Sequence, residues 1–200
     1  MGHVRDTSET FVRKPPAQSG GQGAHPRFSS DQIADLVERG LLHPDARFEL
    51  ILGEIVMSSA ESAKHALTKA RISRALCAWV LDMDVGQNVS LQLSSESIVD
   101  PDVLVWRPGI HGTFFQAHQA VLAIEVSLSR LRHDLEVKPA LYAESGVPEI
   151  WVVDVEGEVT HVFSDPQQSV YRRMLTYAFT DPIPLALAPA GVLVIADLLG

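Results

Sequence analysis

Hydrophobic residues recur at helical spacing in one long segment and form strand-like runs in several others. Residues 62–81 show the helical period, which predicts an amphipathic helix. The apolar positions that repeat there and just beyond it are Ile72, Ala75, Leu76, Trp79, Val80 and Met83. Residues 88–93 alternate like a half-buried strand. Residues 98–106 and 119–127 are nearly continuously apolar, which indicates strands covered on both faces.

The segment before this central part carries capping and turn signals. Ser29 and Gln32 form a capping box at the start of a short helix, and Gly40 is a good C-terminal cap. Two strand-like runs within residues 47–57 flank Leu52 and Gly53, which predicts a β-hairpin.

The C-terminal part continues with a helix over residues 138–145 that ends at Gly146. A buried strand, its antiparallel neighbour, a weaker strand and a closing element follow at residues 149–155, 158–163, 171–179 and 192–199. This order of elements predicts an α/β fold in which a mixed β-sheet is flanked by helices, with an N-terminal helix and β-hairpin.

Composition indicates a globular domain with a real core, because 46% of the 200 residues are hydrophobic and 20% are charged. We expect residues 1–26, rich in Gly, Pro, Ser and Gln, to form a flexible arm and residues 27–200 to form a single domain. No apolar run reaches transmembrane length and no secretory h-region is visible, so we expect no membrane association. The single cysteine, Cys77, lies in the predicted long helix, and we expect its thiol in the core. A chain with one cysteine forms no internal disulfide, so we expect a cytoplasmic location.

The formal net charge of −9 argues against broad, charge-driven binding of nucleic acid. It does not exclude a nuclease, because carboxylates that bind a metal make the count more negative. Any contact with DNA would come from a local basic surface.

Two carboxylates within apolar strands, Asp102 and Glu125, are followed by Lys138. A buried charge is costly unless it is paired or binds a metal, and two neighbouring carboxylates repel unless a cation lies between them. Their oxygens suit Mg²⁺ or Mn²⁺, which would activate water beside a phosphate while the lysine assists. This combination fits phosphodiester hydrolysis. Structural roles are the alternative: Asp102 in a turn, Glu125 paired with Arg130 or Arg132, and Lys138 on the surface.

From Arg47 to about Phe163 the chain resembles the Uma family of putative restriction endonucleases, in the PD-(D/E)XK nuclease superfamily. The resemblance is carried by Phe48-Glu49-Leu50-Ile51 with Gly53-Glu54, His65, Pro101-Asp102-Val103-Leu104, Glu125-Val126-Ser127, Asp134, Lys138, Tyr142 and the run from Gly146 to Asp154. It implies a restriction-endonuclease-like core and metal-dependent cleavage of DNA.

The resemblance also implies roles for these residues. Asp102 and Glu125 match the two acids of the family motif, and Lys138 matches a lysine supplied by the following helix. Glu49 and Glu54 match the acids of the family's hairpin, and we favour Glu49 as the third metal ligand. Ser127 stands where the superfamily motif often has lysine. Pro139 predicts a helix that starts near Lys138 after a loop, and leaves the direction of the lysine side chain open.

The remaining candidates have weaker signals. His65, near Glu61 and Lys69, either reaches the site or is a solvated first-turn histidine. Asp134 and Tyr142 lie one turn to either side of Lys138, where they support it or simply pack. Arg130 and Arg132, on the loop after Glu125, are candidate DNA contacts. We expect Trp79 and Trp151 in the core and Trp106 partly exposed.

The sequence therefore favours a Mg²⁺- or Mn²⁺-dependent endonuclease acting on DNA. The main alternative is a non-catalytic binding or regulatory protein that keeps the fold, and a hydrolase of a smaller phosphoester is a third. Because one site cuts one strand, a homodimer is compatible with the first hypothesis.

Overall fold

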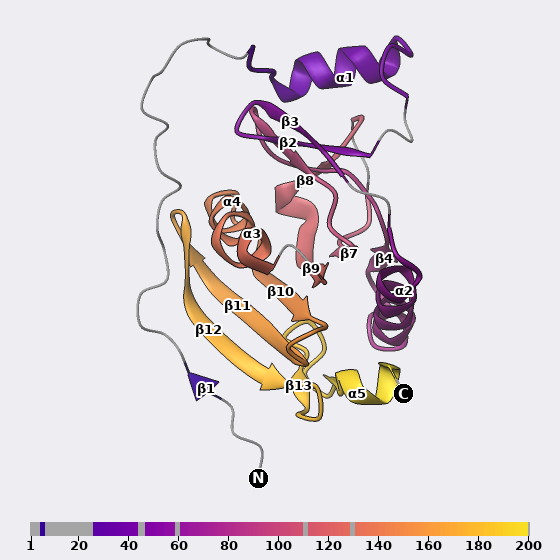
Figure 1. Cartoon of the computed structure of the whole chain (residues 1–200), viewed down its shortest axis with the longest axis vertical. Helices are drawn as coiled ribbons and strands as arrows, with labels where there is room; N and C mark the ends of the chain where they lie inside the picture. Colours follow the sequence, from indigo (N-terminus) through magenta and orange to yellow (C-terminus); the bar gives the residue numbers. More distant parts are fainter. Residues whose placement is uncertain are drawn as a thin grey trace.

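The computed structural model describes residues 5–6, 26–43, 47–58, 61–109, 112–128 and 131–199, and these residues form two principal β-sheets (Figure 1). The larger sheet has the strand order β1 (Arg5–Asp6), β12 (Val170–Ala178), β11 (Val159–Gln167), β10 (Glu149–Asp154), β9 (Ala120–Ser127), β7 (Val103–Trp106) and β4 (Asp84–Gly86). The smaller sheet has the order β3 (Glu54–Met57), β2 (Phe48–Ile51), β6 (Ser97–Val99), β5 (Leu91–Ser94) and β8 (Phe115–Gln116). Apart from β1, the predicted arm of residues 1–26 lies almost wholly outside the described residues.

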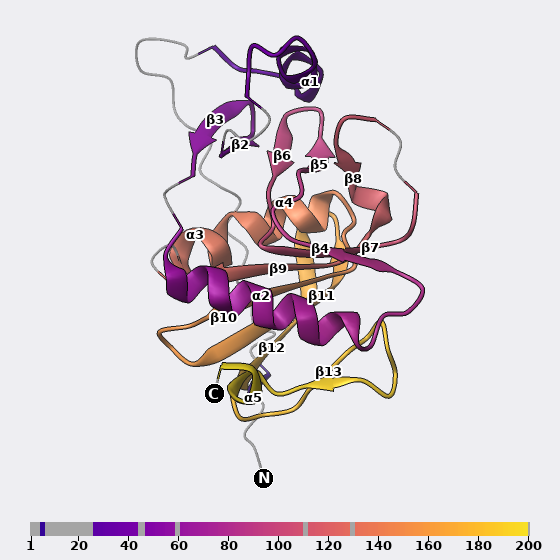
Figure 2. The same ribbon diagram turned by 90° about the vertical axis from the view of Figure 1, so that its right-hand side faces the viewer.

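The helices are α1 (Ser30–Glu38), α2 (Ala63–Cys77), α3 (Leu131–Glu136), α4 (Lys138–Glu144) and α5 (Ile195–Leu199), with a 3-10 turn, η1 (Ala117–Gln119), before β9. Helix α1 packs on the smaller sheet, whereas α2 and α4 cover opposite faces of the larger one. A short pair of strands, β13 (Ile183–Pro184) and β14 (Val192–Leu193), precedes α5. Figure 2 shows α2 running across one face of the sheet, with α3 and α4 beyond the opposite face. Since β9 pairs in parallel with β10 and antiparallel with β7, the sheet is mixed, as the sequence predicts.

The alternation of side chains along the central strands explains why both faces are covered. On one face, Leu122 and Ile124 of β9 share a fully buried cluster with Trp151 of β10 and with Ile72 and Leu76 of α2. The next residues along the same strands point the other way, so the sheet needs a second covering layer.

The second layer is α4. Ala123 of β9 and Ile150 of β10 pack there with Leu141 and Tyr142 of that helix. Alternation places Glu125, two residues after Ala123, on this same face. A carboxylate is thereby carried into the layer between the sheet and α4.

The N-terminal helix and hairpin form as the sequence predicts. Ser29 and Gln32 make the capping box of α1, and Ile33 packs against Leu50 of the smaller sheet. The β2–β3 turn has positive φ at Leu52 (51°) and at Gly53 (83°), the combination that a two-residue type I′ hairpin requires. A Cβ at position 53 would also lie only 3.0 Å from the side chain of Arg27, which adds to the need for glycine there.

Several local predictions are wrong. The long helix ends at Cys77, and Val80 reaches the core from the turn that follows, which extends the apolar period beyond the helix. Cys77 is exposed rather than in the core, since it lies about 100° around the helix from the buried Leu76. The residues before Lys138 are predicted as a loop but include the helix α3. Its Leu131 and Leu135 pack against the hydrophobic cluster between the sheet and α4.

Two of the three tryptophans also differ from expectation. Trp79 is 40% exposed, because it follows the end of α2. Trp106 is buried, and the ring of Phe115 packs against it in a tilted arrangement with a centroid separation of 4.6 Å. Trp151 is fully buried in the core, as predicted.

Among the described residues, every helix is too short or too polar to be a candidate membrane span.

The central strand β9 allows a direct test of this core. Leu122 is fully buried and Leu81 is 88% exposed, so the same substitution probes opposite environments. We expect Leu122→Ala to lower the free energy of unfolding by about 3 kcal/mol, through lost burial and the cavity left behind. Leu81→Ala should change it by less than about 0.5 kcal/mol. Urea unfolding followed by circular dichroism measures both, and equal effects would contradict the described packing.

Candidate active site

One cleft, with a volume of about 420 Å³, collects ionisable side chains from segments that are far apart in the sequence. Six carboxylates line it: Glu49, Glu61, Asp100, Asp102, Glu125 and Asp134. Five basic side chains face them: Arg47, His65, Lys69, His133 and Lys138. The cleft therefore gathers acidic and basic groups in nearly equal number, with one more acid than base.

The Pro-Asp segment breaks the strand at the point where the cleft begins. The register of β7 with β9 starts at Val103 opposite Ile124, and Asp102 stands just before it in a bend. Its side chain turns toward β9, where Oδ2 accepts a hydrogen bond from the backbone N–H of Val126 at 2.7 Å. Asp102 is thus fixed beside Glu125, although the two acids come from different strands.

Lys138 lies between two buried acids. Its Nζ is 2.8 Å from Oε2 of Glu125 and 3.0 Å from Oε1 of Glu49. Pro139 does not turn the lysine away, because it stands in the first turn of α4, where a missing backbone N–H breaks no helical hydrogen bond. The preceding residue, Val137, keeps a helical conformation and connects α3 to α4.

Tyr142 reaches the same carboxylate from one turn further along α4. Its hydroxyl donates to Oε1 of Glu125 at 2.7 Å, so both oxygens of Glu125 have a donor. Glu49 is held too, since its Oε1 accepts from the backbone N–H of Asp100 at 3.2 Å. The hairpin, the Pro-Asp bend, β9 and α4 therefore meet at one point.

The electrostatics of this cluster are those of an acid-rich site. Burial raises the pKa of Glu125, and the charges of Asp102, Glu49 and Asp134 raise it further, against the opposing effect of Lys138. Burial alone would lower the pKa of Lys138, but Glu125, Glu49 and Asp134 outweigh this and raise it. The lysine is therefore a permanent cation, and its single charge does not neutralise the acids around it.

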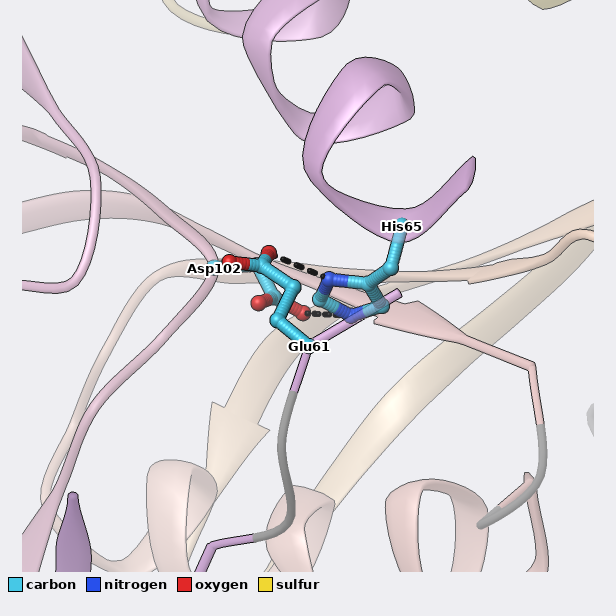
Figure 3. A group of neighbouring side chains, drawn as sticks. All are labelled: Glu61, His65 and Asp102. Carbon is cyan, nitrogen blue, oxygen red and sulfur yellow. Dashed lines mark hydrogen bonds and ion pairs between the residues drawn. The ribbon is translucent and has the colours of Figure 1, made fainter. Parts of the chain in front are cut away.

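His65 joins α2 to the Pro-Asp bend (Figure 3). Its Nδ1 is 2.7 Å from Oε1 of Glu61, and its Nε2 is 2.8 Å from the carbonyl oxygen of Val126 and 3.2 Å from Oδ2 of Asp102. The hydrogen bond to Asp102 is the main cause that raises the pKa of His65 to about 9, against the effect of burial. The solvated first-turn histidine that the sequence left open is thereby ruled out.

Glu61 is paired on every side. Its carboxylate is 2.6 Å from Nζ of Lys69 and 3.1 Å from Arg47, besides the contact with His65. Burial raises the pKa of Glu61, but these hydrogen bonds outweigh it and lower the value to about 2.

Two sets of side chains have the chemistry to hold a divalent cation. Glu49, Asp102 and Glu125 line the same cleft and offer carboxylate oxygens, the donor type that Mg²⁺ and Mn²⁺ prefer, with Lys138 between Glu49 and Glu125. Glu61, His65 and Asp102 offer ligand atoms that all lie within 4.8 Å of one another. The cleft also contains buried oxygens without a hydrogen-bond partner in the described structure, Oδ1 of Asp100 and Oγ of Ser127. The oxygen donors of the cleft therefore have the chemistry that a hard cation prefers, while among the described residues the spacing within 4.8 Å is met by the group of Glu61, His65 and Asp102.

The structure brings together most of the residues singled out in the sequence. Asp102, Glu125, Lys138, Glu49, His65 and Asp134 line the cleft, and Tyr142 contacts Glu125. Glu54 does not line it, because the hairpin turn carries this residue to an exposed position on β3. Arg132 is exposed and pairs with Glu136 within α3, at 3.0 Å. Arg130 lies outside the described residues.

Sequence reasoning missed that Arg47, Glu61 and Lys69 belong to the site. For two of them a signal was present: Glu61, His65 and Lys69 follow one another at intervals of four residues, which places them along one face of a helix. Arg47 had no such signal, because its contact with Glu61 depends on how the hairpin packs beside α2.

The ion pairs of Lys138 predict a pH-dependent effect of removing it. In metal-free protein, Lys138→Met leaves two buried carboxylates without their cation, and we expect a loss of about 3 kcal/mol at pH 9.5. The loss should be much smaller near pH 6. Burial raises the pKa of Glu125 to about 8 although Lys138 lowers it, so removing the lysine raises this pKa further, and the penalty relative to the wild type grows as pH rises through about 8.

Urea unfolding in EDTA at the two pH values measures this difference. Glu125→Gln added to Lys138→Met should restore part of the stability. Lys64→Met is the matched control, since Lys64 pairs with Glu156 on the surface. A loss that is the same at both pH values would contradict the charge argument.

Comparison with known proteins places this chain in a family. The family Uma2, described as putative restriction endonuclease, matches residues 32–195. No curated protein matches the chain. Among solved structures, the fold is similar to the crystal structure of a putative nuclease belonging to DUF820 from Anabaena variabilis, with a TM-score of 0.63, 16% sequence identity and coverage of 81% of this chain and 94% of that one. Since the family match spans most of the sequence, the protein belongs to the Uma2 family of putative restriction endonucleases.

Proposed function

We propose that this protein is a metal-dependent endonuclease that hydrolyses phosphodiester bonds in DNA, with Mg²⁺ or Mn²⁺ as cofactor. One observation carries the proposal: Lys138 contacts Glu125 and Glu49 in a cleft that also holds Asp102. Surplus negative charge beside a fixed cation is what a site needs to hold a metal and to face a phosphate at the same time. The family description supports a nuclease.

Glu49, Asp102 and Glu125 would hold the metal in this proposal. When bound, the metal supplies an activated water at neutral pH and neutralises charge on the phosphate. Burial is the main cause that raises the pKa of Glu125, and a cation among these acids would relieve the repulsion that adds to it.

The chain's own residues would then position the reactants. Lys138 has hydrogens to donate to the attacking water or to a phosphate oxygen, and its raised pKa keeps it protonated at neutral pH. Tyr142 holds Oε1 of Glu125, so the carboxylate keeps one orientation. Val126 fixes Asp102 through its backbone N–H.

DNA as the substrate is compatible with the acidic chain only through local positive charge. Arg47, Lys69 and His133 line the same cleft and offer that charge near the acids. Contacts from Arg130 and Arg132 stay predictions, as does a cytoplasmic location. Cutting both strands would require two copies of the chain or two successive events, so we propose a homodimer for double-strand cleavage.

A plasmid-nicking assay tests catalysis. With Mn²⁺ or Mg²⁺ we expect the wild-type protein to convert supercoiled plasmid to nicked circles, and EDTA to stop it. Glu125→Gln should reduce the rate by more than about 100-fold, beyond what is typical for residues that only support a ligand. Lys64→Met should nick like the wild type. Nicking that survives Glu125→Gln would point to a contaminant, and no nicking with intact metal binding would favour the non-catalytic alternative.

Calorimetry tests the metal site separately. We expect Mn²⁺ to bind the wild type and Asp102→Asn to weaken that binding by at least about 10-fold, because a charged ligand oxygen is lost. Lys138→Met should keep metal binding, since the lysine is not a ligand. Equal affinity for wild type and Asp102→Asn would refute the assignment of Asp102.

A further inference from the structure

The environment of His65 determines what this residue can do. The carbonyl oxygen of Val126, 2.8 Å from Nε2, has only lone pairs to offer. A hydrogen bond to it requires the hydrogen on Nε2, which leaves that nitrogen without a lone pair for a metal. The spacing of Glu61, His65 and Asp102 resembles a metal site, but the hydrogen bond to Val126 makes His65 a donor.

The opposite side of the ring leads to the same conclusion. Nδ1 lies 2.7 Å from Oε1 of Glu61, whose carboxylate also pairs with Lys69 and Arg47. A carboxylate that already has three basic partners has little charge left for a divalent ion. Glu61 therefore acts as an anchor that orients the imidazole.

Nε2 also lies within ion-pair distance of Asp102. Oδ2 of Asp102 receives the backbone N–H of Val126 at 2.7 Å and lies 3.2 Å from Nε2 of His65. Both donors gather on one oxygen of the carboxylate. Among the described residues, the other oxygen, Oδ1, has no protein donor, so it is the one available to a metal.

We propose that His65 is a positioning residue that holds Oδ2 of Asp102, so that Asp102 offers only Oδ1 to the catalytic metal. The proposal rests on the proposed function for its catalytic consequence. It replaces the alternative in which Glu61, His65 and Asp102 bind an ion of their own. The side chain of His65 bridges two layers of the fold, because α2 covers one face of the sheet while Asp102 precedes a strand of that sheet (Figure 3).

Two variants distinguish the roles of the two ring nitrogens, because each places an amide nitrogen at the position of one of them. The amide nitrogen of His65→Gln reaches the position of Nε2, so this variant keeps a donor for Val126 and Asp102. The amide of His65→Asn reaches only the position of Nδ1 and keeps the contact with Glu61. We expect His65→Gln to nick plasmid within about 3-fold of the wild-type kcat, and His65→Asn to lose at least about 10-fold in kcat with an unchanged KM for DNA.

Controls distinguish positioning from stability. Both variants should unfold at similar urea concentrations, and Lys64→Gln, on the same helix but at the surface, should change none of the readouts. His65→Asn at full activity, or His65→Gln as inactive as His65→Asn, would overturn the proposal.

NMR spectroscopy tests the inference without any activity. With ¹⁵N-labelled histidine, the Nε2–H signal of His65 should be visible in the metal-free protein and should persist at saturating Mg²⁺. The ¹³C shift of the Asp102 carboxyl should move in His65→Asn and stay near the wild-type value in His65→Gln. Loss of the Nε2 hydrogen on adding Mg²⁺ would show that His65 is a ligand and would overturn the proposal.

These measurements also distinguish a failure of the proposed function from a failure of the proposed role of His65. A wild-type protein that binds Mg²⁺ but does not nick would refute the proposed function, whereas the Nε2–H and carboxyl signals would still decide the role of His65. Mn²⁺ calorimetry adds a further criterion: we expect His65→Gln to keep the wild-type stoichiometry, and loss of one ion per chain in that variant would contradict the proposal.

Discussion

The arrangement of the rest of the site depends on the negative charge that is buried between the central sheet and α4. Strand alternation carries Glu125 into a layer that is otherwise apolar, and desolvation of a carboxylate there is tolerable only with donors and a cation close by. Lys138 and Tyr142, one turn apart on α4, supply both. The start of α4, with Pro139 in its first turn, therefore determines the geometry of the acids as much as the strand does.

The smaller sheet makes a contribution that is easy to overlook. Glu49 reaches the cleft because β2 lies between β3 and β6, and β6 leads directly into the Pro-Asp bend. Glu49 and Glu54 share one face of the hairpin, because Glu54 lies opposite Ile51, two residues after Glu49. Glu49 is buried beside the Pro-Asp bend, whereas Glu54 lies on the edge strand β3 next to the turn and stays exposed.

The central site could be predicted from the sequence because Asp102 and Glu125 interrupt apolar strands, which is a local signal. The mixed sheet followed from the order of elements, and Glu49 was preferred to Glu54 from the hairpin pattern. The contacts of His65 with Val126 and Asp102 could not be predicted, since they depend on how α2 lies beside the bend, a tertiary arrangement without a local sequence signal. Helix α3 was missed for a similar reason: Leu131 and Leu135 are too few to show a period, and packing against the sheet stabilises the segment.

Val126 contributes to the cleft through its main chain. Its N–H holds Asp102 and its carbonyl holds His65, and both groups are available because β7 begins only at Val103, opposite Ile124. A site that depends on peptide groups tolerates changes of the local side chain, provided that the strand keeps its path. The side chain at position 126 can therefore change without moving Asp102 or His65. Substitutions that alter core packing at this position are thus partly independent of the residues that form the candidate active site.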